Sequence, residues 1–456
     1  MTTDTPFLYP ELMDVVRLFG EGYDCTHRFR REGDVFYNTV EAGGHKYSFA
    51  ETQPCADETE FKRYAKRFAK LALYEALRAE TGRSMPWGAL TGIRPTKLAY
   101  AELAAGRPFE PLFEKFGVGP ENIALVSRIL RAQEGLYGFS AGAADLYAGI
   151  PFCPTKCNYC SFITADIRRT GQYVDDYLTA LEGEIAACRG LFSSLHSAYI
   201  GGGTPFVLEP RALERVLRAL QPFVPRGTEY TVEAGRPDVF GEDKLALLQE
   251  YGVTRVCVNP QSFCDETLER IGRRHTAADT ERAFAMARRY PFGVNLDLIA
   301  GLTGESVAQF CRSVDRAVEL APENITVHTL CLKKGARLKE EESRLQEEGV
   351  SAMLAYAREK LTDAGYEPYY LYRQKYMAGN HENTGWCKPG HACAYNVGVM
   401  EEIRDNLACG ANAVSKKLFG RGARIERVGA PKDIPSYIAR AGEVAEKKRA
   451  LFLREG

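Results

Sequence analysis

The chain has 456 residues, a length that favours two or three domains. Its 59 basic and 60 acidic residues nearly cancel, so bulk charge gives no sign of binding to nucleic acid or anionic lipid. The apolar runs are far shorter than the roughly 20 residues of a membrane-spanning helix, and the N-terminal residues lack the apolar core of a signal peptide. We therefore expect a cytoplasmic protein with no membrane partner.

The first 140 residues are predicted to form an α+β module. Residues Tyr23–Phe49 contain short alternating segments broken by glycines, a pattern typical of β-hairpins. Glu58–Ala79 has the periodicity of a long amphipathic helix. The stretch WGALTGIRPTK, Trp87–Lys97, is predicted to be a loop in which Pro95 begins a helix. These residues indicate no mechanism.

Residues 141–335 alternate between strand-like and helix-like segments. The expected strands are Asp145–Phe152, Ser197–Ile200, Glu229–Glu233, Thr254–Val258, Val294–Ile299 and Ile325–Leu330. The expected helices are Gln172–Leu191, Arg211–Leu220, Asp243–Tyr251, Asp279–Arg289 and Val307–Leu320. Such alternation predicts a parallel sheet with right-handed crossovers, either an open sheet or a partial or full barrel. Both forms bind their ligands at the carboxyl ends of the strands.

Residues 336–456 are predicted to form a C-terminal extension that covers the mouth of the barrel. A charged helical stretch, Leu338–Ala364, precedes the aromatic YEPYYLYRQKY and a glycine-rich loop, GNHENTGWCKPGHACAYN. Cys387, His391 and Cys393 in this loop match no standard zinc spacing. Unligated side chains are the simpler interpretation, and a second metal or a haem iron is the alternative.

Three of the 13 cysteines are clustered after the first central strand. Cys153, Cys157 and Cys160 have the spacing C-x3-C-x2-C, which can direct three thiolates to three corners of one iron–sulfur cube. A fourth local cysteine is missing, so one iron would keep an open position for a ligand. Structural zinc and three unligated thiols are the alternatives. Zinc is disfavoured because the next histidine, His196, is 36 residues beyond Cys160.

A second motif, Gly201, Gly202, Gly203 and Thr204, follows the second strand in the sequence IGGGTP. Successive glycines let the backbone approach a ligand closely, and their amides can bind small charged groups. By itself the motif is also explained by a tight turn. One strand–helix unit after the cysteines, it indicates a cofactor site.

With these motifs the chain resembles the radical S-adenosylmethionine (SAM) superfamily, and within it the oxygen-independent coproporphyrinogen III oxidase-like group of HemN, HemW and HemZ. The resemblance covers the central region and continues into the C-terminal extension. WGALTGIRPTK, RQKYMAGN and the segment Cys409–Ala413 resemble the HemZ branch. The resemblance implies a partial (β/α)6 TIM-type barrel, a 4Fe-4S cluster on Cys153, Cys157 and Cys160, and one or two SAM molecules.

The same resemblance implies roles for other residues at the strand ends. Tyr147 and Gly202 match residues that contact the cluster-bound SAM, and Glu233 matches the carboxylate that partners it. Family members with a second SAM place it against the residues that match Tyr159, Gly203, Thr204, Gln261, Arg273, Asp297 and Cys331. Taken singly, each residue has an ordinary alternative, such as a strand-end ion pair for Glu233.

Three departures from the family pattern bear on activity. Gly149 replaces the histidine of Y-x-H-I-P-F-C, and Phe162 stands where the true oxidases carry a fourth cysteine. Glu233 is followed by Ala-Gly-Arg-Pro, one residue longer than E-x-x-P. These differences leave SAM cleavage intact and bear on the oxidase activity.

The motifs are therefore consistent with three functions. The first is a radical SAM oxidoreductase that converts coproporphyrinogen III to protoporphyrinogen IX by oxidative decarboxylation. The second is a haem-binding or haem-trafficking protein that keeps the cluster, favoured by Phe162. The third is a radical SAM enzyme for another substrate.

The implied partners are a tetrapyrrole and an electron donor such as flavodoxin or ferredoxin. We expect a monomer with no nucleic-acid partner. A tetrapyrrole carries several carboxylates, which arginine pairs through two hydrogen bonds. The candidate cations are Arg236, Lys333, Lys334, Arg373 and Lys375, for which solvated surface charges are the alternative.

Overall fold

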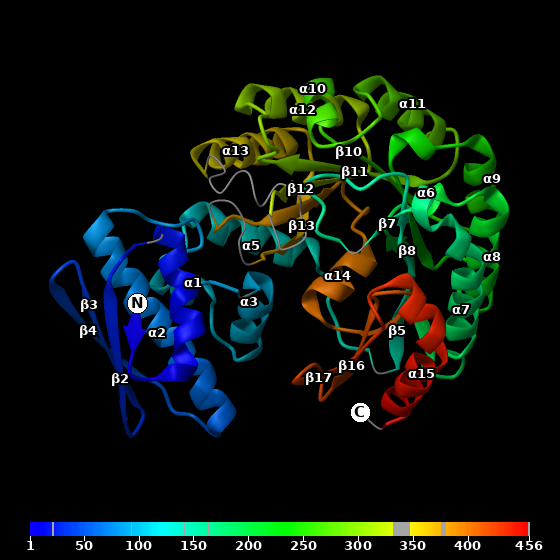
Figure 1. Ribbon diagram of the computed structural model, residues 1–456. Coiled ribbons are helices and arrows are strands. Elements are labelled where there is room, and N and C mark those ends of the chain that lie inside the picture. The colour runs from blue at the N-terminus through cyan, green and yellow to red at the C-terminus, as the bar shows by residue number, and fades with distance from the viewer. Residues whose placement is uncertain are drawn as a thin grey trace. The chain divides into compact units, whose positions relative to one another are not determined.

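A computed structural model of the chain describes residues 1–20, 22–92, 94–140, 142–162, 164–331, 347–374 and 380–454. The chain forms two compact units, each with its own sheet (Figure 1). The first contains residues 1–127 and 372–382, and the second contains residues 128–371 and 383–456. The predicted boundaries after residues 140 and 335 remain a prediction. None of the helices in the described ranges is long and apolar enough to span a bilayer.

The first unit contains the predicted hairpins and long helix. Its sheet has the order β1 (Thr2–Thr3), β2 (Cys25–Glu32), β3 (Val35–Ala42) and β4 (His45–Thr52). Alternate residues of β3 are buried, as expected for a strand with one face on a core, and that strand packs on α2 (Glu58–Thr81). Asp57 caps α2 by accepting a hydrogen bond from the amide of Glu60, and Gly82 ends it in the left-handed conformation.

Short helices complete this unit and lead into the next. They are α1 (Tyr9–Phe19), α3 (Pro95–Ala104), α4 (Glu110–Lys115) and α5 (Pro120–Ala132). Helix α3 begins at Pro95, as the sequence predicted, because proline suits the first helical position, where no intrahelical N–H is required.

The second unit is built on an 11-stranded sheet. Its centre consists of six parallel strands that are neighbours in chain order: β5 (Ala143–Ile150), β8 (Ser194–Gly202), β9 (Glu229–Gly235), β10 (Arg255–Gln261), β11 (Gly293–Ala300) and β12 (Asn324–Thr329). These strands confirm the six predicted ones. Strand β5 is buried along most of its length, as expected for a parallel strand covered on both faces.

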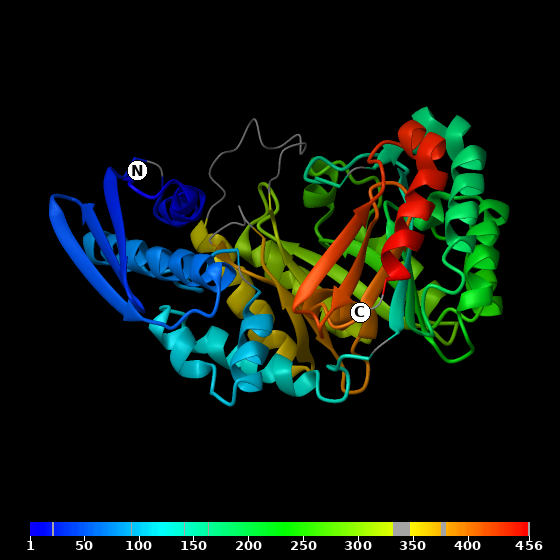
Figure 2. The ribbon, with the colours of Figure 1, turned by 90° about the horizontal axis from the view of Figure 1, so that it is seen from below.

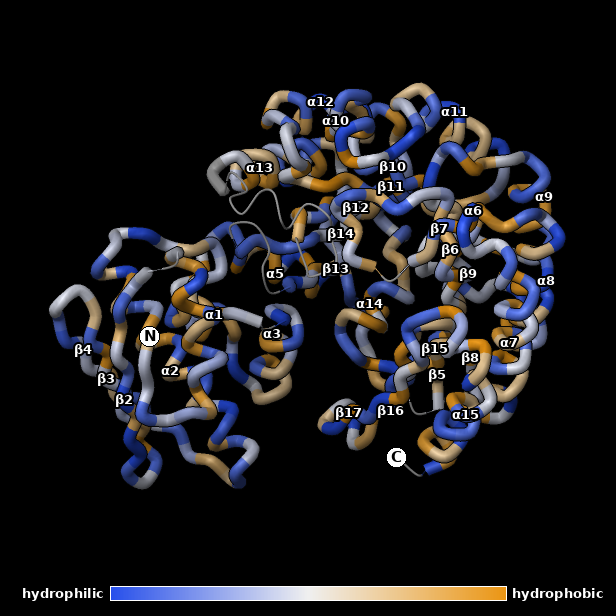
Figure 3. Tube along the Cα trace, in the orientation of Figure 1, coloured by the Kyte–Doolittle hydropathy of each residue, from blue (hydrophilic) through white to orange (hydrophobic). Residues whose placement is uncertain are grey.

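The helices between these strands also confirm the prediction. They are α7 (Val174–Ala186), α8 (Pro210–Leu220), α9 (Glu242–Glu250), α11 (Ala277–Ala287) and α12 (Val307–Leu320). They lie along the outer side of the curved sheet (Figure 1). Their hydrophilic residues are interspersed with hydrophobic ones, as in amphipathic helices that cover a sheet (Figure 3). The arrangement is the partial (β/α)6 barrel of the predicted fold class.

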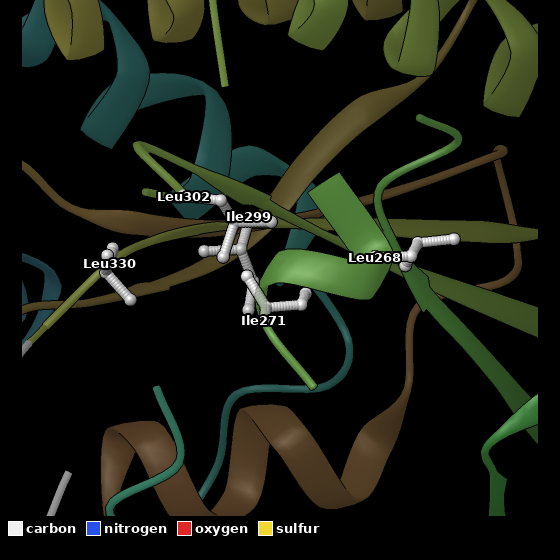
Figure 4. Packing of buried hydrophobic residues seen from close by; sticks show 5 residues of the cluster. All are labelled: Leu268, Ile271, Ile299, Leu302 and Leu330. Atoms are coloured by element: carbon white, nitrogen blue, oxygen red, sulfur yellow. The ribbon is translucent and has the colours of Figure 1, made fainter. Parts of the chain in front are cut away.

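Short elements line the carboxyl ends of the parallel strands. They are β6 (Phe152–Cys153), β7 (Ala165–Asp166), α6 (Ile167–Thr170) and α10 (Asp265–Arg270). A cluster of buried side chains joins α10 to the ends of β11 and β12 (Figure 4). Its members are Leu268, Ile271, Ile299, Leu302 and Leu330. Tyr159, which is partly buried, packs against this cluster.

The C-terminal region adds strands to both edges of this sheet. Beyond β12 lie β14 (Asn383–Cys387), antiparallel to it, and β13 (Glu367–Tyr372). Beyond β5 lie β15 (Asp405–Cys409), parallel to it, then β16 (Val414–Phe419) and β17 (Arg424–Gly429). The helices of this region are α13 (Glu347–Asp363), α14 (Ala394–Glu401) and α15 (Ile434–Phe452).

The prediction of a glycine-rich loop at 379–396 was wrong in part, because β14 and the start of α14 lie within it. Gly385 is buried in β14, and a Cβ there would overlap the ring of Tyr370. The glycine therefore serves close packing rather than a turn. The part of the predicted helix at 338–346 lies outside the described residues.

Helix α15 lies beside α7 (Figure 2), and a buried ion pair joins the two helices. Lys448 Nζ lies 2.6 Å from Glu184 Oε1, and the two side chains are 1% and 0% exposed. The other oxygen, Glu184 Oε2, accepts hydrogen bonds from Tyr437 Oη at 2.6 Å and from the amide of Gly410 at 2.7 Å.

Candidate cluster and SAM site

The three clustered cysteines lie past the carboxyl end of β5. Cys153 is in β6, and Cys157 and Cys160 follow in the loop, where the amide of Cys160 donates to the carbonyl of Cys157 at 3.2 Å. All three are free thiols; Cys157 is buried and the others are partly buried. Burial raises the pKa of Cys160 to about 11, and a bound metal would favour its thiolate form.

The three thiols of this loop are the donor type that holds an iron–sulfur cluster. Within the described ranges, no three Cys, His, Asp or Glu side chains are grouped to hold one metal ion. A cube takes each thiolate on a different iron, so its ligands need not converge. Gly203 leaves space beside the first cysteine of the cluster motif, because a Cβ there would lie 2.9 Å from Cys153 Sγ. Thr204 Oγ1 also donates to this sulfur at 3.6 Å.

The glycine motif brings the end of β8 against Glu233. Gly202 has a φ of +113°, and its amide donates to Glu233 Oε2 at 3.3 Å. A Cβ at Gly201 would lie 2.9 Å both from Glu233 Oε2 and from the ring of Tyr199. Glycine is therefore needed at 201 to 203 because neighbouring side chains and backbone pack closely there, and the predicted approach of a ligand to these glycines remains a prediction.

Glu233 is a partly buried carboxylate at the end of β9. Tyr199 Oη donates to its Oε1 at 2.6 Å. No Lys, Arg or His of the described part of the chain forms an ion pair with it. Burial raises the pKa of Glu233 to about 7; the Tyr199 hydrogen bond opposes this rise and the nearby Asp297 adds to it. Such a group is suited to receive an ammonium from a ligand.

Three tyrosine rings form a stack beside this carboxylate. The ring centroids of Tyr199 and Tyr395 are 4.4 Å apart with an interplanar angle of 23°. Tyr147 lies against both, at 6.1 Å from Tyr199 and 6.4 Å from Tyr395. Sequence reasoning missed Tyr395, which comes from α14 and reaches the site only through long-range packing of α14 on β8.

The residues matched to a second SAM lie along the neighbouring strand ends. Arg273 donates to Tyr159 Oη at 2.9 Å and to the carbonyl of Asn259 at 2.6 Å, which brings two of the predicted residues together. Gln261 ends β10 with a φ of 70°, and its buried Oε1 has no hydrogen-bond partner in the described structure.

The other two members of this set lie one and two strands further along. Asp297, on β11, lies 3.8 Å from His328 Nε2 on β12, and Cys331 is partly buried just past β12. A second SAM at these residues remains a prediction.

Two predicted substrate cations are buried and already bonded, so they do not present a free guanidinium to a ligand carboxylate. Arg236 is 3% exposed and bonds to Asp238 and Thr155. Arg373, in the first unit, donates to the carbonyl of Leu90 and to Asn380 Oδ1, and burial lowers its pKa to about 9. Lys333, Lys334 and Lys375 lie outside the described residues.

The second cysteine group occupies separate environments. Cys387 is buried in β14, and His391 is exposed. Cys393 precedes α14 with its Sγ 3.3 Å from Glu229 Oε1. Within the described residues, this trio is not grouped around one metal position.

The family model of the radical SAM superfamily matches residues 147–317. The oxygen-independent coproporphyrinogen-III oxidase-like protein HemZ of Bacillus subtilis is 36% identical over 416 residues, which cover 87% of this chain and 82% of that protein. The heme chaperone HemW of Escherichia coli is 28% identical over 285 residues, 61% of this chain and 71% of that protein.

The solved coproporphyrinogen III oxidase HemN of Escherichia coli aligns with a TM-score of 0.56 and 23% identity over 68% of this chain and 72% of that chain, a likeness of fold. The parallel core and the matched region define a radical SAM protein, a class that uses a 4Fe-4S cluster and SAM. The chain belongs to the oxygen-independent coproporphyrinogen III oxidase-like group, with HemN, HemW and HemZ.

Proposed function

We propose that the protein cleaves SAM at a cluster on Cys153, Cys157 and Cys160 and acts on a tetrapyrrole, with coproporphyrinogen III as its substrate. One observation carries the SAM site. Glu233 is a carboxylate with no ion-pair partner in the described structure, and it accepts a hydrogen bond from the Gly202 amide. The next residue, Gly203, packs on Cys153.

The residues around the cluster have distinct tasks in this proposal. When bound, the reduced cluster supplies the electron that splits SAM into methionine and a 5′-deoxyadenosyl radical. Glu233 accepts the ammonium of SAM, and Gly202 and Gly203 let its methionine portion approach. Tyr147 and the stacked rings of Tyr199 and Tyr395 cover the floor of the site and exclude water.

The substrate is supported by the names of the relatives, HemN an oxidase and HemZ oxidase-like. In the proposed reaction, two propionates become vinyl groups. Each propionate loses carbon dioxide, a hydrogen atom that the 5′-deoxyadenosyl radical takes to form 5′-deoxyadenosine, and one electron that an external acceptor takes. The chain would supply the orientation of each propionate toward SAM.

A second function, haem binding without oxidase chemistry, is favoured by Phe162. This side chain is 69% exposed beside the cysteine loop, at the place of the oxidase's fourth cysteine. An exposed aromatic ring can stack on a macrocycle. HemW proteins among the relatives are named heme chaperones.

The test is an anaerobic reaction of reconstituted protein with SAM, a reductant and coproporphyrinogen III. The proposal expects 5′-deoxyadenosine together with protoporphyrinogen IX, and neither product from Cys157→Ala. Formation of 5′-deoxyadenosine with unchanged coproporphyrinogen would refute the oxidase activity. Saturable haem binding that Phe162→Ser weakens would then support the second function.

A further inference from the structure

Arg236 reaches from the end of β9 into the cysteine loop. Its Nε and Nη2 donate to the two carboxylate oxygens of Asp238 at 2.9 and 2.7 Å. Its Nη1 donates to Thr155 Oγ1 at 2.5 Å and to the Thr155 carbonyl at 3.3 Å. The side chain of Arg236 is 4% exposed, so little water competes for these bonds.

Thr155 lies where these hydrogen bonds can restrain the cysteine loop. Thr155 is the central residue between Cys153 and Cys157 in C-x3-C, so a contact that fixes it also restrains the two thiols on either side. The planar guanidinium has donors on two sides, so it can hold Asp238 in a two-bond pair and Thr155 at the same time. A lysine, with one ammonium, cannot reproduce this geometry.

The turn before Arg236 also packs close to the first cysteine of the loop. Gly235 has a φ of +79°, and a Cβ there would lie 3.2 Å from Thr204 Cγ2. Thr204 in turn donates to Cys153 Sγ. The extra residue between Glu233 and the following proline thus belongs to a turn that packs on the neighbours of the first thiol.

Other hydrogen bonds restrain the part of the loop that follows Cys157. Asn158 donates from its amide to the carbonyl of Ile271 at 3.0 Å and from Nδ2 to the carbonyl of Arg270 at 3.1 Å. Arg273 holds Tyr159. These bonds fix the segment after Cys157, whereas Arg236 acts on the segment between the first two cysteines.

We infer that Arg236, oriented by Asp238, is a positioning residue that clasps Thr155 and holds Cys153 and Cys157 at the spacing the cluster requires, with or without the cluster present. The inference rests on the assignment of these cysteines as cluster ligands. The clasp preorganises the loop, which otherwise would have to be ordered by the cluster itself.

The first experiment measures amide hydrogen exchange in the cluster-free protein, which needs no activity. Arg236→Lys is expected to make the amides of residues 155–157 exchange about tenfold faster, because the bonds from Arg236 to Thr155 no longer restrain the loop. Amides of β9 and β10 should be unchanged. Arg226→Lys, at an exposed position, is the matched control.

The second experiment uses the reconstituted protein. Arg236→Lys should lose its cluster to a chelator several-fold faster than wild type and should alter the electron paramagnetic resonance spectrum of the reduced cluster. Thr155→Val, which removes only the Oγ1 bond, should produce a smaller effect of the same kind. Should Arg236→Lys unfold, Thr155→Val decides the matter by the same two measurements.

Unchanged loop exchange and an unchanged cluster in these variants would overturn the clasp. A wild-type protein that binds no cluster would instead overturn the ligand assignment and the proposed function, while the exchange measurement would still report on the clasp. The two failures are therefore distinguishable.

Discussion

Two carboxylates of the second unit, Glu184 and Glu233, have opposite surroundings. Glu184 is completely buried and bonds to Lys448, to the Tyr437 hydroxyl and to the Gly410 amide. Glu233 lies at the open strand ends with one tyrosine hydroxyl, one backbone amide and no ion pair among the described residues. The first has its charge neutralised within the fold.

The difference between these surroundings distinguishes a carboxylate that stabilises the fold from one that is available to a ligand. A buried carboxylate with a cation and a full set of donors has no remaining capacity for a ligand. A partly buried carboxylate without a cation is held at a cost in free energy, which its raised pKa records, and an incoming ammonium relieves that cost. This contrast supports the proposal that Glu233 binds the ammonium of SAM.

The largest expected effect concerns the cluster proposed beside Glu233. Without that cluster, the contrast between Glu233 and Glu184 would have no functional meaning. Cys157→Ala removes one of only three thiolates, so bound iron should fall from about four per chain to less than one. Iron and sulfide analysis after anaerobic reconstitution measures this. Cys311→Ala, a cysteine of α12, should keep the full cluster, and a full cluster in Cys157→Ala would exclude that residue as a ligand.

The next largest effect tests the structural role of the ion pair between Glu184 and Lys448. Lys448→Met leaves Glu184 buried without its cation, so the free energy of unfolding should fall by about 3–5 kcal/mol. Urea denaturation of the cluster-free protein measures it. The double variant Lys448→Met with Glu184→Leu should recover only part of the loss, because leucine leaves the Tyr437 hydroxyl and the Gly410 amide without their acceptor. A loss below about 1 kcal/mol in the single variant would mean that the pair matters little to the fold.

A smaller effect is expected at the functional carboxylate. Glu233→Gln keeps the shape of the side chain and removes its charge, so SAM affinity should fall by roughly tenfold to a hundredfold while the cluster is retained. Equilibrium dialysis with labelled SAM provides the value. Glu209→Gln, an exposed position, is the control. Equal affinity in Glu233→Gln and wild type would move the ammonium contact to another residue.

The smallest effect is a shift in pH dependence. With a Glu233 pKa of about 7, the ionised form that attracts an ammonium prevails above pH 7, so SAM affinity should fall as the pH drops below that value. The hydroxyl of Tyr199 lowers this pKa, so Tyr199→Phe should move the fall to higher pH. Affinity measured from pH 5.5 to 8.5 tests both, and Tyr251→Phe serves as control. A profile that is flat in wild type would contradict the role of Glu233.

The sequence predicted the parts of the fold and site that depend on local patterns. The six parallel strands and their helices follow from short-range periodicity, and the cysteines and glycines of the site each occupy one short segment. Tyr395, the clasp by Arg236 and strand β14 were not predicted. Each depends on packing between segments distant in the chain: Tyr395 against Tyr199, Arg236 against Thr155, and Gly385 beneath Tyr370.

Strand β15 has a consequence for the order of events during synthesis. It pairs with β5, the strand that leads into the cysteine loop, along residues 405–409. Until the ribosome has released those residues, β5 is an edge strand with unpaired backbone groups on one side. The nascent chain therefore carries its cysteines long before their support is complete. We therefore expect the cluster to be loaded after translation, on a finished sheet.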